Sequence, residues 1–139
     1  MNATTIYTLR TLLAAAAIAL SPEAASAQAK LSAKRGCDSV AGAAAFKTRC
    51  AICHGVQAEG SAVGPSLKGV FGAKAATGPY DKYSQGLKAA KVTWTSANLD
   101  LWLAQPAAIA PGTGMIVAVP DPVERKNLIA YLATLKAAK

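Results

Sequence analysis

The most constraining feature of this chain is the motif Cys50-Ala51-Ile52-Cys53-His54. Two cysteines separated by two residues and followed directly by histidine form the attachment sequence for a c-type haem. The two thiols can add across the two vinyl groups of a haem and leave thioether bonds, which places the next residue beneath the iron. Because a neutral imidazole is a good donor to haem iron, His54, the only histidine in the chain, is the predicted proximal ligand.

Two other kinds of site also use closely spaced cysteines, and we weighed both against haem attachment. A thioredoxin-like dithiol normally follows a strand in a βαβ unit, whereas the segment before Cys50 is rich in alanine and predicts a helix. A zinc site could use Cys37, Cys50, Cys53 and His54, but structural zinc ligands are usually spaced by two or more residues. A disulfide between Cys50 and Cys53 would close too small a ring to be useful. The motif therefore favours haem attachment.

Cys37 is the one thiol left over once a haem is attached. In an oxidising compartment, a leftover cysteine can form an intermolecular disulfide. The alternative is an inert residue that precedes the first helix, and the sequence leaves both interpretations open.

The N-terminal segment predicts a secretory signal peptide. Arg10 precedes an apolar run at 12–20, and Ala25-Ser26-Ala27 is a small-residue cleavage site. The apolar run is too short to span a bilayer, although a retained membrane anchor is the alternative. We therefore expect removal of residues 1–27, export to the periplasm and no stable membrane insertion afterwards. A short polar lead-in at 28–37 and a single domain at 38–139 would remain.

The chain is strongly basic. It has 15 Lys and Arg against 7 Asp and Glu, a formal net charge of +8 that could attract nucleic acid, anionic lipid or an acidic protein face. The lysines are scattered singly rather than clustered, and nucleic acid is not expected outside the cytoplasm. The predicted partners are redox proteins with an acidic docking face, and we expect the protein itself to be a monomer.

Helix signals stand at both ends of the predicted domain. Asp38 or Ser39 can cap a helix that runs to about Lys47. Near the C-terminus, Asp121 can cap a second helix in which Pro122 takes the first helical position. The second of these helices has an apolar stripe at helical spacing: Leu128, Ile129, Leu132 and Leu135.

A third helix is predicted between them, from Thr95 until Pro106 ends it. Its apolar residues follow helical spacing: Leu99, Trp102 and Leu103. The segments 55–79 and 107–120 are rich in Gly, Pro and Ser or lack lasting periodicity, and they predict loops. Three short helices and long loops make a poor core alone, so we expect an all-α, single-domain fold wrapped around the covalently attached haem.

Met115 is the sole methionine left after removal of the signal peptide. A lone methionine is usually core filler, but this one lies in a Pro/Gly loop far downstream of His54. We therefore predict Met115 as the distal iron ligand. A thioether ligand raises the reduction potential compared with two imidazoles. With both axial positions filled, the iron has no site for oxygen or peroxide.

With these residues in place, the chain closely resembles the class I c-type cytochromes, the group of mitochondrial cytochrome c and its small bacterial periplasmic relatives. The segments that carry the resemblance are Cys50–His54, Gly64–Gly72, Thr93-Trp94, Pro111–Met115 and Leu128–Leu132. It implies that the first and last helices cross, with Gly42 and Phe46 against Leu128 and Tyr131. It also implies that the Pro65 carbonyl accepts a hydrogen bond from the His54 ring. The other residues implied at the haem are Leu67, Tyr83, Trp94, Leu99, Trp102 and Leu103.

The sequence departs from the pattern of this family at three places. Ala73 stands where relatives often have an arginine that supports a haem propionate, with Lys74 beside it. Trp102 stands where many have a tyrosine near the methionine sulfur, and its indole N–H could donate instead. The lysines that surround the haem edge in mitochondrial relatives are replaced here by Ala107, Ala108 and Gly114.

The predicted function is that of a periplasmic one-electron carrier with a single covalent haem c, not an enzyme. One alternative is an electron-accepting haem subunit dedicated to one periplasmic dehydrogenase. A less favoured one is a ligand-binding or peroxide-reducing haem protein. The single histidine counts against the last alternative, because it leaves no acid–base group for the distal side of the haem.

Overall fold

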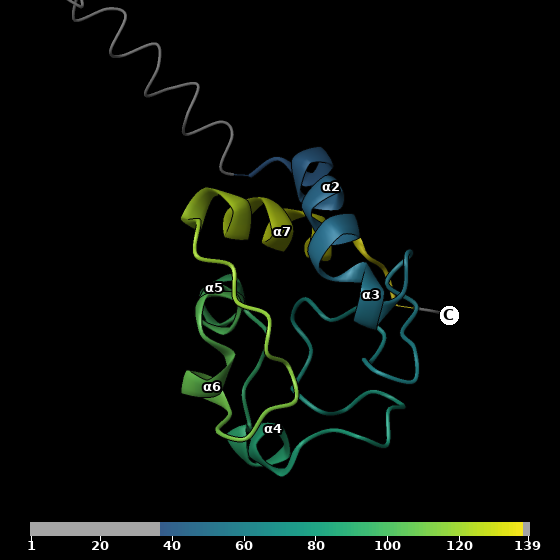
Figure 1. Cartoon of the computed structure of the whole chain (residues 1–139), viewed down its shortest axis with the longest axis vertical. Coiled ribbons are helices and arrows are strands. Elements are labelled where there is room, and N and C mark those ends of the chain that lie inside the picture. The colour runs from purple at the N-terminus through teal and green to yellow at the C-terminus, as the bar shows by residue number, and fades with distance from the viewer. Residues whose placement is uncertain (1–36, 138–139) are drawn as a thin grey trace, which may run out of the picture.

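The computed structural model describes residues 37–137, which form helices joined by long loops (Figure 1). In chain order the helices are α2 (Ser39–Arg49), α3 (Ala51–His54), α4 (Gln85–Ala90), α5 (Ser96–Ala104), α6 (Pro106–Ile109) and α7 (Pro122–Thr134). Extended pairing within the described part of the chain is limited to one antiparallel bridge between Lys74 and Thr93. The predicted all-α class is confirmed.

The proposed signal peptide at 1–27 and all but the last residue of the lead-in at 28–37 lie outside the described residues. Cys37, the first residue described, is exposed and its thiol is free. Within the described range, none of the helices is long and apolar enough to cross a membrane.

The three predicted helices begin where their capping residues indicated. The Asp38 carboxylate accepts from the N–H groups of Val40 and Ala41 at 2.8 and 3.1 Å and so caps α2. Thr95 caps α5 by accepting from the N–H of Asn98 at 3.3 Å. Asp121 caps α7, with proline at the first helical position. In each case a side-chain oxygen satisfies an N–H that the first turn leaves without a partner.

Three further helices were not predicted, of which α3 is the single turn that carries the attachment motif. α4 begins after Ser84, whose hydroxyl accepts from the N–H of Leu87 at 3.2 Å. α6 begins at Pro106, so the prediction of a loop at 107–120 is wrong for its first residues. Pro106 does end α5, as predicted, but a proline also suits the first position of a new helix because that position needs no N–H donor.

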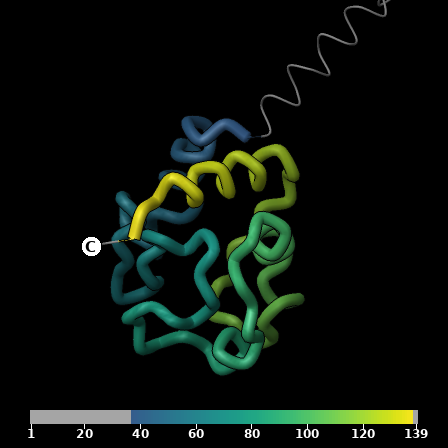
Figure 2. The backbone as a smooth tube through the Cα atoms, turned by 180° about the vertical axis from the view of Figure 1, so that it is seen from behind, coloured from purple at the N-terminus to yellow at the C-terminus, as the bar shows by residue number. Residues whose placement is uncertain are grey.

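The first and last helices cross at one end of the molecule, as the views in Figures 1 and 2 both show. Gly42 of α2 lies so close to α7 that a Cβ atom there would overlap the carbonyl of Asn127. One turn later, the rings of Phe46 and Tyr131 pack with centroids 5.3 Å apart. Phe46 and Leu128 are both fully buried at this crossing. The helix crossing implied by the family resemblance is therefore present.

A second group of buried side chains comes from α5 and the segment before it. Trp94, Leu99, Trp102 and Leu103 are all buried, and the indole rings of Trp94 and Trp102 pack 5.1 Å apart at 57°. These residues do not fill the centre of the fold. They form one wall of the central cavity.

Candidate functional site

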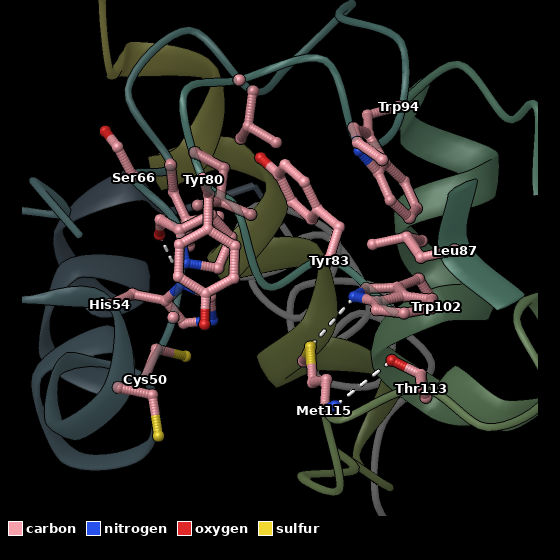
Figure 3. Close-up of a pocket in the computed structure, with 18 of the residues that line it drawn as sticks. Cys50, His54, Ser66, Tyr80, Tyr83, Leu87, Trp94, Trp102, Thr113 and Met115 are labelled. Carbon is pink, nitrogen blue, oxygen red and sulfur yellow. Dashed lines mark hydrogen bonds between the residues drawn. The ribbon is translucent and has the colours of Figure 1, made fainter. Parts of the chain in front are cut away.

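The centre of the fold is a cavity of about 410 Å³. Cys50, Cys53 and His54 lie on one wall, supplied by α3 and the turn before it. Trp102 of α5 and Met115 of the loop between α6 and α7 lie on the other (Figure 3). The cavity thus brings together chain segments that are about 60 residues apart in the sequence.

One turn of backbone fixes the two cysteines and the histidine relative to one another. The N–H groups of Cys53 and His54 both donate to the Cys50 carbonyl, at 3.1 and 2.9 Å. The thiols of Cys50 and Cys53 are free and half-buried. Burial raises the pKa of the Cys50 thiol to about 11, so this group is a thiol and not a thiolate at neutral pH.

The His54 ring is oriented by the backbone of the following loop. Its Nδ1 lies 2.8 Å from the Pro65 carbonyl oxygen, the contact that the resemblance implied. Because a carbonyl can only accept, Nδ1 carries the proton and Nε2 keeps its lone pair. Burial lowers the pKa of His54 despite this hydrogen bond, which favours the neutral ring that a metal ion requires.

Gly64 allows the loop to approach this closely. A Cβ atom at Gly64 would lie 2.7 Å from the Cys53 carbonyl oxygen and 3.1 Å from the His54 Nδ1. Ser61 adds a second tie, since its hydroxyl donates to the same Cys53 carbonyl at 2.6 Å. The loop at 61–66 therefore packs directly against the backbone and ring of the predicted proximal ligand.

The opposite wall holds the sulfur of Met115 in a defined position. The Trp102 Nε1 donates to the Met115 Sδ at 3.0 Å, and the Met115 N–H donates to the Thr113 hydroxyl at 3.2 Å (Figure 3). Trp102 is itself held by the packed ring of Trp94. The indole N–H considered in the sequence analysis is therefore in contact with the sulfur.

All other residues predicted at the site line the same cavity: Pro65, Leu67, Tyr83, Trp94, Leu99 and Leu103. Ala73 and Lys74 line it as well. Two lining residues were not predicted from the sequence: Tyr80, whose ring packs 5.2 Å from that of Tyr83, and Leu87 of α4. The cap formed by Ser84 is the sequence signal that could have located α4, and with it Leu87.

The residues of the cavity fit a c-type haem better than either alternative site. A haem needs two thiols on one turn, a nitrogen donor beside them and mostly apolar walls, all of which this cavity has. No three His, Cys, Asp or Glu side chains gather within residues 37–137 as a zinc site would require. The segment before Cys50 is α2 and not the strand of a thioredoxin-like unit.

Comparison with known proteins decides the family. A family model described as cytochrome c matches residues 39–136. The chain belongs to the cytochrome c family. Its membership confirms three predictions: the class I cytochrome c fold, a haem c bound covalently through the Cys-x-x-Cys-His motif, and electron transfer rather than enzymatic activity.

Similar proteins include bacterial cytochromes. The chain is 42% identical over 99 residues to the cytochrome c-type cyt cy of Rhodobacter capsulatus, covering 70% of this chain and 49% of that protein, so it spans about half the length of that relative. It is 41% identical over 99 residues to cytochrome c2 of Rhodomicrobium vannielii, covering 70% of this chain and 78% of that one. Among solved structures, cytochrome cH from Methylobacterium extorquens superposes with a TM-score of 0.62 at 44% identity, covering 70% of this cytochrome and 98% of the other.

Proposed function

We propose that this cytochrome is a periplasmic one-electron carrier in which His54 and Met115 are the axial ligands of a haem attached at Cys50 and Cys53. The observation that carries the proposal is the placement of a neutral imidazole and a thioether on opposite walls of one cavity (Figure 3). The haem supplies an iron that exchanges one electron between the ferrous and ferric states. The residues of the chain around the haem orient its ligands.

On the proximal side, the chain orients and strengthens the nitrogen donor. The bond from His54 Nδ1 to the Pro65 carbonyl fixes the ring and makes Nε2 a better donor. Gly64 and Ser61 hold the loop that carries this carbonyl. We expect these contacts to persist in both oxidation states, so that little rearrangement accompanies electron transfer.

On the distal side, the chain supplies a soft ligand and no acid–base group. Trp102 and Thr113 are the polar side chains bonded to Met115, and neither an indole N–H nor a threonine hydroxyl titrates near neutral pH. Thioether ligation favours the reduced iron. This arrangement suits a carrier that makes and breaks no bond in a substrate.

The mouth of the cavity combines apolar and basic side chains. Val63 and Ile116 line the cavity and are 69% and 91% exposed. Lys82 also lines it, and its Nζ donates to the Ala62 carbonyl at 3.2 Å. We infer brief docking of a redox partner whose apolar patch is bordered by acidic residues, since electron-transfer interfaces are small and the chain is basic.

The attachment and ligation are tested by optical spectroscopy of the purified ferric protein. The haem should stay with the polypeptide through acid–acetone extraction, and the spectrum should contain the weak red band of sulfur-to-iron charge transfer. Met115→Ala should lose that band, lower the potential and bind cyanide rapidly. Ile116→Ala, which alters the neighbouring, 91% exposed side chain, is the matched control and should keep the band. An unchanged band in Met115→Ala would exclude Met115 as the ligand.

The partner is tested by the salt dependence of electron exchange with candidate periplasmic proteins. The rate with an acidic partner should fall as salt rises, because the Debye length shrinks from about 10 Å at 0.1 M to about 3 Å at 1 M. A rate independent of salt would point to docking by the apolar residues alone. Co-purification with a single dehydrogenase would instead favour the dedicated-subunit alternative.

A further inference from the structure

Arg125 of α7 connects its own helix and α5 to the end of the methionine loop, which comprises residues 110–120. Its Nε and Nη2 face the carboxylate of Asp100 on α5, at 2.8 and 3.5 Å. Its Nη1 donates to the carbonyls of Val119 and Pro120, at 3.0 and 2.8 Å. The Arg125 side chain is only 13% exposed, whereas the Asp100 side chain is 39% exposed, so the guanidinium is shielded from water and its partners are shielded only in part.

Few other hydrogen bonds hold this end of the methionine loop, whose Val119 side chain is buried in the core. The N–H of Val119 donates to the Leu103 carbonyl at 2.7 Å. Between Met115 and Val119, the described structure contains no hydrogen bond to the backbone of residues 116–118. Ile116, directly after Met115, is 91% exposed. The first fixed point after the sulfur is therefore the Val119–Pro120 segment, where two of the three bonds come from one side chain.

We infer that Arg125 is a positioning residue for Met115: by holding the end of the loop it sets how often the sulfur leaves the iron. Asp100 orients the guanidinium, and the guanidinium satisfies the two carbonyls. This inference rests on the proposed ligation by Met115. Local openings of a fold cost less free energy than global unfolding, and the anchors of the moving segment set that cost.

The charge of the anchor makes it strong. Hydrogen bonds to charged groups contribute more than neutral ones, and a planar guanidinium holds a carboxylate and two carbonyls in one fixed geometry. Removing it leaves two carbonyls and the Asp100 carboxylate without that partner. The opening that releases Met115 should then become about 10-fold to 100-fold more frequent, from the range of such bonds.

The chain offers a matched control on the next residue. Glu124 of α7 pairs with Arg49 of α2, with Nε and Oε1 2.6 Å apart. That pair also ties α7 to another helix, but it does not contact the methionine loop. Glu124→Gln thus removes an ion pair from the same helix and leaves the anchor of the loop intact.

The experiment measures imidazole binding to the ferric holoprotein by stopped flow. At high imidazole the rate reaches a limit that equals the rate at which the native sulfur ligand departs. Arg125→Leu should raise this limiting rate about tenfold or more, Asp100→Asn less, and Arg125→Lys should partly restore the wild-type value. Glu124→Gln should leave it unchanged. On heating, Arg125→Leu should lose the sulfur-to-iron band well before its helices unfold.

A limiting rate within twofold of wild type in both Arg125→Leu and Asp100→Asn would overturn the inference. An equal rise in Glu124→Gln would also overturn it, because global stability would then explain the effect. If Arg125→Leu does not fold, Asp100→Asn and Arg125→Lys decide the question. Met115→Ala separates the two proposals: slow imidazole binding in that variant refutes the ligation itself, whereas fast binding leaves only the role of Arg125 at stake.

Discussion

The indole Nε1 of Trp102 lies 3.0 Å from the Sδ of Met115 and donates a hydrogen bond to it. A thioether sulfur has two lone pairs, and in the proposed holoprotein one binds the iron while the other accepts this bond. A donor on the second lone pair withdraws electron density from the sulfur. The ferric iron needs that density more than the ferrous iron does, so the bond should favour the reduced state.

Trp102→Phe should therefore lower the reduction potential. A hydrogen bond has a net value of about 1 kcal/mol, which corresponds to about a fivefold change in the ferric-to-ferrous ratio and about 40 mV for one electron. The measurement is a spectroscopic redox titration of the two proteins. The sulfur-to-iron band should remain in the variant but shift, since the ligand is retained.

The control for lost volume is an indole analogue at position 102 in which sulfur replaces the N–H, 3-benzothienylalanine. It keeps the ring that packs against Trp94 but cannot donate. The analogue should lower the potential as Trp102→Phe does. A potential equal to wild type in the analogue would show that packing and not the hydrogen bond matters.

Much of this site could be predicted from the sequence because its residues are marked by local patterns. Cys50, Cys53 and His54 follow one another on one turn, and Met115 is the one methionine beyond the signal peptide. Capping residues located α2 and α7 for the same reason, and the helical spacing of apolar residues located α5. The anchor formed by Arg125 could not be predicted in this way. It depends on how closely α5 and α7 approach each other. The spacing of residues within one segment of the sequence does not indicate that distance.

The failure to predict α4 and α6 from the sequence has a related explanation. α4 and α6 are 6 and 4 residues long, too short to display a helical apolar period. Their positions matter through tertiary contacts: a Cβ atom on Gly86 of α4 would overlap the carbonyl of Pro111. Such a contact between a short helix and a loop has no signature in the sequence beyond the glycine itself.

Gly86→Ala should displace the start of the methionine loop. The added methyl group would push Pro111 away, which shifts a segment only four residues before Met115. The haem should remain attached, since α3 is not involved, but the sulfur-to-iron band should weaken or vanish. Gly114→Ala is the control, because a Cβ atom there meets no protein atom within 4 Å. Equal spectra for the two variants would contradict the prediction.

Gly42→Ala should destabilise the crossing of α2 and α7. A methyl group at Gly42 would overlap the Asn127 carbonyl, and overpacking of this kind costs about 1–3 kcal/mol. Denaturant unfolding of the ferric holoprotein should show a lower midpoint with a similar slope. Ala44→Gly changes the exposed side of the same helix and should cost only about 1 kcal/mol through helix propensity. A loss no larger than that in Gly42→Ala would argue against a tight crossing.

The last prediction concerns alkaline pH. In related cytochromes, lysines of the methionine loop displace the sulfur from ferric iron as pH rises. Here the corresponding positions are Ala107 and Ala108 of α6 and Gly114 of the methionine loop, and no lysine lies between Lys91 and Lys126. The lysines that do line the cavity belong to other loops: Lys68, Lys74 and Lys82. Met115 should therefore stay bound to higher pH than in such relatives, or give way to hydroxide.

An alkaline titration of the ferric protein, followed through the sulfur-to-iron band, measures this. Gly114 is exposed and has open space around it, so Gly114→Lys should fold and should restore a lysine-ligated form at lower pH. Gly114→Gln adds a neutral side chain of similar length and should behave as wild type. The reason is that the lysine amine can bind the iron whereas the glutamine amide cannot, and moving an amine from another loop requires more of the fold to open. A nitrogen-ligated lysine form of the wild type at ordinary alkaline pH would refute the argument.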